Sequence, residues 1–111
     1  MATTSQVASI RKGVVELAIL GLLANGPRYG QQLVEELSQQ AALALTPGTV
    51  YPLVSRLLKD RMIASTWEES PVGPPRKYYR LTAAGTRRLS DLTEAWRQVR
   101  SALDVILKEK P

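Results

Sequence analysis

The sequence contains no cysteine and no histidine among its 111 residues. Without cysteine there is no disulfide, iron–sulfur cluster or thiolate zinc site, and without histidine the commonest general base and metal ligand is missing. The serines therefore lack a histidine base, and the neighbouring carboxylates Glu35 and Glu36 point apart on a helix rather than sharing one site. We therefore expect neither an enzyme nor a metal site, and no cofactor.

Long apolar segments are also absent. The longest apolar run, residues 17–24, has eight residues, whereas a membrane-spanning helix needs about 20. Residues 1–10 lack the charged start and apolar stretch that are typical of a signal peptide. We expect a cytoplasmic protein that does not bind a membrane.

What is present is a globular composition with an uneven basic excess. Apolar residues make up 44% and charged residues 23%, which suits one folded domain. The net charge is +5, and residues 46–81 hold six basic and three acidic residues, whereas residues 1–45 hold three of each. A basic excess alone usually marks only a solvated surface, so the residue pattern must decide whether it binds nucleic acid.

The first 40 residues predict two helices. Apolar side chains surround a helix over residues 10–24, which the Asn-Gly-Pro sequence at residues 25–27 ends. In the second helix Tyr29, Leu33 and Leu37 lie four residues apart and form one apolar face. The pattern indicates a buried central helix followed by a short amphipathic one.

A third helix is predicted to start at Thr46 and Pro47. Threonine caps free backbone N–H groups, and proline loses nothing at the first helical position. Because Pro52 removes a hydrogen bond, we expect the regular helix to start nearer Val50. Apolar residues follow helical spacing through residue 58, and the outer face is polar with few acidic residues.

Two strands and a long helix complete the chain. Residues 62–67 and 76–81 have strand character, and the segment between them contains three prolines and a glycine, as an exposed hairpin turn would. Thr82 caps the last helix, whose apolar residues alternate at spacings of three and four, as in a coiled coil. A second copy of the chain would bury this seam. The seam consists of Leu89, Leu92, Trp96, Val99, Leu103 and Ile106.

This order of elements predicts a winged helix-turn-helix fold, mainly α with a small β-hairpin. We expect residues 1–81 to form a DNA-binding domain and residues 82–111 a dimerisation helix. In such a fold the third helix enters the DNA major groove, and the hairpin reaches an adjacent groove or the backbone. The basic part of the chain covers both of these contacting elements.

Four segments resemble the PadR family of bacterial transcriptional regulators. They are Tyr29-Gly30, PGTVYPL at residues 47–53, Arg56-Leu57 and PRKYYRLT at residues 75–82. The chain is similar to the small subclass with a single C-terminal helix. The resemblance implies a homodimeric DNA-binding repressor whose affinity for its operator drops when an effector binds.

The resemblance also implies DNA-contacting residues. Helix residues would face base edges or phosphates, the start of the second helix would meet a phosphate, and the hairpin would supply cations. Two alternatives stay open: Tyr51 packs beside Leu33, and Arg76 with Lys77 is only a solvated strand end. The implied residues are Tyr29, Gly30, Thr49, Tyr51, Ser55, Arg56, Lys59, Arg76 and Lys77.

Trp96 has two interpretations. It resembles the aromatic residue with which some small PadR regulators stack planar hydrophobic compounds between subunits, or it is an ordinary interface residue. Glu16 would face the same cavity and attract cationic effectors. Arg100, one turn beyond Trp96, would either pair with Glu16 or repel such cations.

An alternative function comes from a different class of protein. The last helix would bind a protein partner, and the winged fold would serve only as its scaffold. This interaction module predicts a preference for heterodimers and tolerance of charge reversal at Arg56, Lys59 and Lys77.

Overall fold

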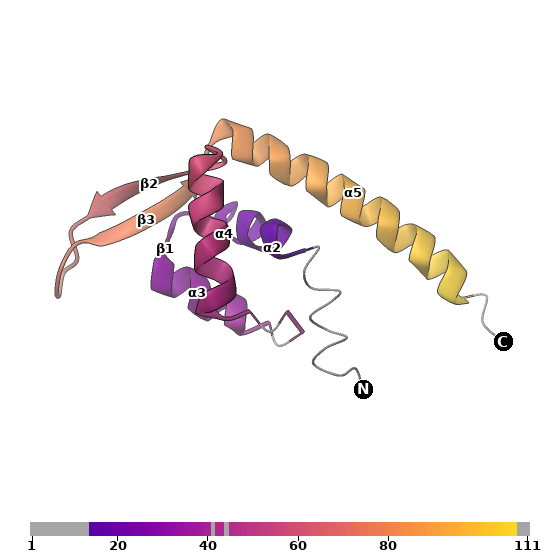
Figure 1. The fold of residues 1–111 in the computed structure, drawn as a ribbon, viewed down its shortest axis with the longest axis horizontal. Helices are drawn as coiled ribbons and strands as arrows, with labels where there is room; N and C mark the ends of the chain where they lie inside the picture. Colours follow the sequence, from indigo (N-terminus) through magenta and orange to yellow (C-terminus); the bar gives the residue numbers. More distant parts are fainter. Residues whose placement is uncertain (1–13, 41, 44, 109–111) are drawn as a thin grey trace.

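The structure is a computed structural model that describes residues 14–40, 42–43 and 45–108. The predicted helix start at residues 10–13 and the N-terminal residues 1–10 lie outside the described residues. The described residues form four helices and three strands (Figure 1). In chain order these are α2 (Val15–Leu23), β1 (Arg28–Tyr29), α3 (Gly30–Ser38), α4 (Pro47–Lys59), β2 (Ile63–Glu68), β3 (Arg76–Leu81) and α5 (Ala83–Lys108).

The core lies between α2, α3, α4 and one face of the sheet. Ile19, Leu20, Leu33 and Val50 from the three helices are 0% exposed, and Ile63 of β2 is 2% exposed. Burying one such side chain stabilises the fold by about 1.5–3 kcal/mol. The predicted apolar stripe of α4 is confirmed, since its buried residues follow helical spacing. These contacts leave the opposite face of α4 toward solvent.

The sheet is antiparallel with the order β1-β3-β2. β3 has the predicted bounds, and β2 starts and ends one residue later than predicted. The assignment of Tyr29 to the apolar face of the second helix was wrong, because Tyr29 lies in β1 and pairs with Tyr78. After the turn at residues 24–27 the chain is extended, and β1 pairs its backbone groups along the free edge of β3.

α4 starts at Pro47, as predicted, and only the expectation that the regular helix begins nearer Val50 was wrong. The N–H groups of Thr49 and Val50 both donate to the Thr46 carbonyl, which completes the first turn. Pro52 removes only its own N–H from the helix. Thr46 occupies the N-cap position, but its hydroxyl lies 3.5 Å from the Thr49 hydroxyl and caps no backbone N–H. The carbonyl of Thr46, rather than its side chain, anchors the helix start.

The first turn of α5 is fastened to the turn between α4 and β2. The Thr82 hydroxyl accepts a hydrogen bond from the Gly85 N–H at 3.0 Å, which confirms the predicted cap. The same hydroxyl lies 2.7 Å from the Arg61 carbonyl and 3.0 Å from the Met62 carbonyl. A Cβ atom at Gly85 would lie 1.9 Å from the Met62 carbonyl oxygen, so the close approach requires glycine.

From this root α5 runs past α2 and extends away from the rest of the fold (Figure 1). Leu89 and Leu92 pack against the core, and the later apolar residues of the helix are exposed. The molecule is correspondingly elongated, with extents of 58 × 30 × 21 Å. Neither α5 nor any other described helix is long and apolar enough to cross a membrane.

Candidate nucleic-acid interface

The outer face of α4 is polar and carries positive charge. Tyr51, Ser55, Arg56 and Lys59 are exposed there, and Thr49 is half-buried. The helix contains no Asp or Glu between its first and last residues. Its cations are therefore not neutralised from within the helix, and the face can approach a polyanion.

Tyr51 extends from α4 to the start of α3. A Cβ atom at Gly30 would lie 3.1 Å from Cε1 and 3.3 Å from the hydroxyl oxygen of Tyr51, so the ring rests directly on the glycine. The side chain nevertheless stays 40% exposed. Tyr51 thus packs on α3, one turn before Leu33, and still presents surface to a ligand.

Arg76 contacts Tyr29 on the face of β3 that points away from the core. Its guanidinium carbon lies 4.4 Å from the centroid of the Tyr29 ring, and Tyr29 meets Tyr78 edge to face at 5.5 Å. Cation–π attraction holds the guanidinium over the ring while leaving the charge exposed. Since Tyr29 directly precedes Gly30, three predicted residues from two strands and α3 come together here.

Lys77 lies on the opposite face of β3, because successive side chains alternate along a strand. Its ammonium nitrogen is 5.9 Å from the centroid of the Tyr79 ring. Burial raises the pKa of Tyr79, and the proximity of Tyr51 raises it further, so Tyr79 stays neutral beside the ammonium. Arg76 and Lys77 therefore serve two different faces of the hairpin.

The charged residues predicted near the effector are arranged differently. Glu16 accepts hydrogen bonds from Arg88 of α5 at 3.3 and 3.1 Å, and these bonds raise the pKa of Arg88. Arg100 instead lies 3.8 Å from Asp104, one turn along α5. The pairing of Arg100 with Glu16 was thus wrong within one chain, because the shorter contact of Arg88 occupies the Glu16 carboxylate. That contact also weakens any attraction of Glu16 for cationic compounds.

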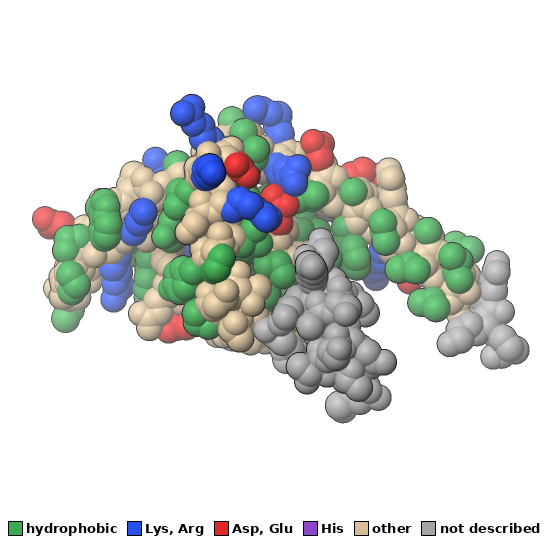
Figure 2. Space-filling view, in the orientation of Figure 1, with side chains coloured by type: hydrophobic (Ala, Val, Ile, Leu, Met, Phe, Trp, Pro, Cys, Tyr) green, Lys and Arg blue, Asp and Glu red, His purple; other side chains and the backbone are tan. Residues whose placement is uncertain are grey.

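The heptad seam divides into two parts. Leu89 and Leu92 pack against the core of their own chain. Trp96, Val99, Leu103 and Ile106 are 39–61% exposed. In Figure 2, hydrophobic side chains follow α5 toward its C-terminal end, and cationic ones gather over the upper end of α4 and the start of α5.

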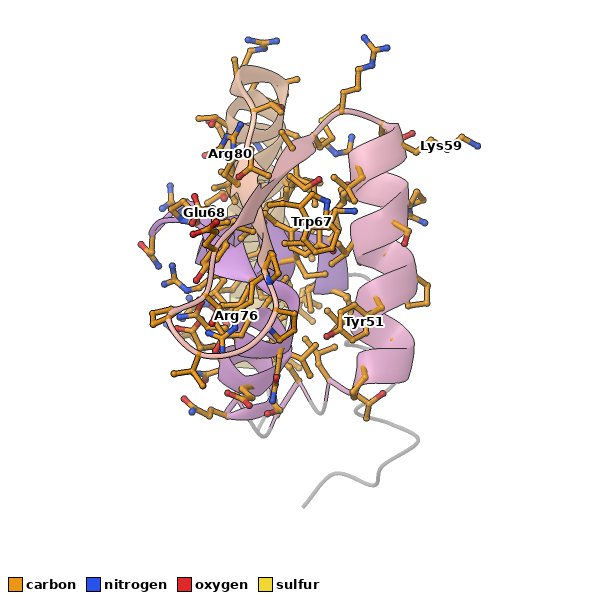
Figure 3. The ribbon with its side chains drawn as sticks, turned by 90° about the vertical axis from the view of Figure 1, so that its left-hand side faces the viewer. Tyr51, Lys59, Trp67, Glu68, Arg76 and Arg80 are labelled. Atoms are coloured by element: carbon orange, nitrogen blue, oxygen red, sulfur yellow. The ribbon has the colours of Figure 1, made fainter. Side chains whose placement is uncertain are left out.

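Two features of this surface were missed from the sequence. Arg28 donates to Glu36 at 2.6 Å and so ties β1 to α3, a contact that no local pattern indicates. Trp67 is 70% exposed near the end of β2, although its strand propensity alone predicts nothing beyond a strand residue. Figure 3 places it between the hairpin and α4. The signal available in the sequence was an aromatic residue one position before the last residue of the strand, close to a polar hairpin turn.

Comparison with known proteins agrees with this architecture. The model of the "Transcriptional regulator PadR-like family" matches residues 19–91. Transcriptional regulator Rv3488 of Mycobacterium tuberculosis is 35% identical over 82 residues, which cover 73% of this chain and 74% of that protein.

Solved structures extend the similarity over nearly the whole chain. A PadR-like transcriptional regulator from Bacillus cereus is 30% identical with a TM-score of 0.84, covering 92% of this chain and 99% of that one. A PadR family regulator from Eggerthella lenta is 31% identical with a TM-score of 0.83, covering 96% and 93%. The predicted winged-helix architecture is confirmed by these matches. The chain belongs to the PadR-like family of transcriptional regulators.

Proposed function

We propose that the protein is a homodimeric, sequence-specific DNA-binding repressor that a small hydrophobic effector releases from its operator. The observation that carries this proposal is the exposed face of α4, which bears Arg56 and Lys59 and no carboxylate, beside a hairpin that bears further cations. A recognition helix and a wing with this charge suit the major groove and the neighbouring phosphates.

Each DNA contact follows from the position of its side chain. Thr49, Tyr51 and Ser55 would meet base edges or nearby phosphates in the major groove, because all three side chains of α4 keep exposed surface. Cationic and backbone groups would fix the register on the phosphates. The phosphate contacts would come from Tyr29, the Gly30 N–H, Arg56, Lys59, Arg76 and Lys77.

A second copy of the chain would cover the exposed part of the seam. Four apolar residues at coiled-coil spacing lie in solvent on one helix, and an identical helix offers the matching surface. A two-fold axis through this contact would place two recognition helices about 34 Å apart, one turn of DNA. Under this proposal residues 1–81 bind DNA and residues 82–111 supply the dimer contact.

The effector would bind where the two copies of α5 meet. Trp96 lies on the seam and is 39% exposed, so its indole is available to stack on a planar hydrophobic compound. Dye binding measured by tryptophan emission tests this site against an interface role. Equal dye affinity of the wild type and Trp96→Ala would overturn the effector site.

The DNA-binding function is tested by titrating duplex fragments of candidate promoters at several salt concentrations. Affinity should fall steeply with salt, and Arg76→Ala or Lys77→Ala should each lower the slope of log affinity against log salt by about 1. Lys108→Ala, at the end of α5, is the matched control and should leave the slope unchanged. Absence of duplex binding by the wild type at low salt would overturn the proposal.

The exposed end of α5 also suits a protein partner, which is the second candidate function. An interaction module would tolerate charge reversal at Arg56, Lys59 and Lys77, since none of these residues belongs to α5. A pull-down that recovers only the chain itself, together with loss of duplex binding by Arg56→Glu, would reject this candidate.

A further inference from the structure

Trp67 stands at the point where one face of the hairpin leaves the core. On this face of β2, Ile63 is 2% exposed, whereas Trp67, four residues later on the same face, is 70% exposed. Across the strands Ile63 pairs with Leu81, and Trp67 pairs with Lys77. The indole is therefore held on an ordered strand beside a cation, and little of it is covered by its own chain.

The hairpin face that bears Trp67 is turned toward α4. β2 packs against α4, and Figure 3 shows Trp67 of β2 and Tyr51 of α4 projecting into the region between the two elements. Tyr51 is itself 40% exposed. Two partly free aromatic side chains thus lie between the two elements that the proposed function brings to DNA.

The charge around Trp67 favours a polyanionic partner. Lys77 is its cross-strand neighbour, and α4 contributes no carboxylate. Glu68 follows Trp67 in the chain, but it is in register with Arg76 and belongs to the other face. In duplex DNA, phosphates alternate with apolar deoxyribose surfaces, so an indole next to an ammonium group matches both.

The position of Trp67 argues against a second copy of the chain as its partner. The exposed apolar end of α5 and the hairpin lie at opposite ends of the molecule in Figure 1, whose longest extent is 58 Å. A second copy that covers the α5 seam of a chain would therefore leave Trp67 of that chain uncovered.

We propose that Trp67 is a DNA-contacting residue whose indole packs on a deoxyribose of the strand that passes between α4 and the hairpin, while Lys77 meets the adjoining phosphate. This inference rests on the proposed DNA-binding function. The contact of Trp67 is apolar and releases no counterion, so it adds affinity without adding salt dependence.

The test is duplex affinity at several salt concentrations for Trp67→Ala, Trp67→Phe and Lys77→Ala. Trp67→Ala should lose about tenfold in affinity with an unchanged salt slope, and Trp67→Phe should retain most of the affinity. Lys77→Ala should lower the slope by about 1. Thr66→Ser is the matched control, since Thr66 lies on the opposite face of the same strand and serine keeps the hydroxyl that accepts a hydrogen bond from Arg80 at 3.1 Å; it should bind as the wild type does.

Fluorescence gives an independent readout, because the sequence contains two tryptophans. Trp96→Phe leaves Trp67 as the sole emitter, and its emission should shift to the blue or be quenched when duplex is added. Circular dichroism should show Trp67→Ala to be folded, because little of the indole is buried.

The outcomes separate the two proposals. If the wild type binds duplex but Trp67→Ala binds equally well and the emission stays constant, the role of Trp67 is rejected and the DNA-binding function stands. If Trp67→Ala changes the association state of the protein rather than its duplex affinity, Trp67 forms a protein contact and the inference is overturned. If no variant and no wild-type sample binds duplex, the proposed function itself fails.

Discussion

The two halves of α5 follow the same spacing of three and four residues but lie in different surroundings. In the first half, Leu89 and Leu92 pack against the core of their own chain. In the second half, Val99 and Leu103 are 53% and 47% exposed. Apolar periodicity therefore indicates that a helix face is covered, but it does not indicate which surface covers it.

The two halves also differ in how they are held. Thr82 and Gly85 fasten the first half through backbone and hydroxyl contacts with the turn at Arg61 and Met62. The end of the second half extends beyond the folded body (Figure 1). Substitutions in the first half should therefore reduce folding stability, and substitutions in the second should reduce association.

The largest effect is expected at the root of α5. Gly85→Ala places a Cβ atom 1.9 Å from the Met62 carbonyl oxygen, so the helix must move. We expect a loss of about 2–4 kcal/mol in the free energy of unfolding, measured by urea denaturation. The control is Gly21→Ala in α2, where a Cβ atom would meet nothing within 4 Å among the described residues beyond its own helix backbone and chain neighbours; it should raise stability by about 0.5–1 kcal/mol. Equal stability of the two variants would contradict the close contact.

A charge in the second half should separate the copies. Leu103→Asp puts a carboxylate in the apolar seam, and we expect the dimer dissociation constant to rise about 100-fold, or about 2.7 kcal/mol. Sedimentation equilibrium measures this constant. Ser101→Asp adds the same charge on the outer face of α5 and should leave it nearly unchanged. A Leu103→Asp protein that remains fully dimeric would place the interface elsewhere.

A smaller effect is expected where the first half meets α2. The Arg88 and Glu16 side chains are 47% and 21% exposed, so solvent screens their attraction. We expect Glu16→Gln to reduce the free energy of unfolding by about 0.5 kcal/mol at low salt and by less at high salt. Glu69→Gln, in the hairpin turn, is the control. A loss that persists at high salt would indicate packing rather than charge.

The smallest effect concerns the pH dependence of folding stability and involves Tyr79 of β3. Burial, and secondarily Tyr51, raises the pKa of Tyr79 above its ordinary value of 10.0. Because the pKa of Tyr79 is higher in the folded state, neutral Tyr79 contributes stability at pH values below 10.0. This contribution is lost as the pH rises through the pKa of Tyr79 in the folded state. The free energy of unfolding of Tyr79→Phe should therefore fall less steeply with rising pH, above pH 10.0, than that of the wild type. Phenolate absorbance in Tyr51→Phe should show Tyr79 titrating closer to its ordinary value.

Much of the fold was predictable because its signals are local. The apolar spacing of α4 and the proline-rich turn between the strands identified the third helix and the hairpin, and β3 has the bounds expected from its composition. β1 was not predictable, because two residues carry no periodicity and become a strand only beside β3. Tyr29 has the same four-residue spacing as Leu33 and Leu37, so the spacing alone predicts one helix. The boundary between β1 and α3, after Tyr29, is set by the pairing of Tyr29 with Tyr78.

The candidate site was predictable in its residue types and less so in its geometry. The polar face of α4 follows from helical spacing alone. Arg100 meets Asp104 one turn along the same helix, a contact that i, i+4 spacing alone could have indicated. The partner of Glu16, in contrast, depends on how α5 crosses α2, and no local pattern encodes that crossing. Alternation places Trp67 on the same face as Ile63, but where the core ends along that face depends on the length of the packed helices.

The close contact between Gly85 and Met62 holds the start of α5 next to the end of α4, so any tilt of α5 would take place about this contact. A helix of 26 residues is about 39 Å long, so a tilt of about 5° at Gly85 displaces the far end by about 3 Å. In the homodimer that we propose, a small displacement where the two copies of α5 meet would in turn reorient α4 in each copy. In that proposed homodimer, Gly85 would link the spacing of the two α4 helices to whatever binds between the C-terminal parts of the two α5 helices.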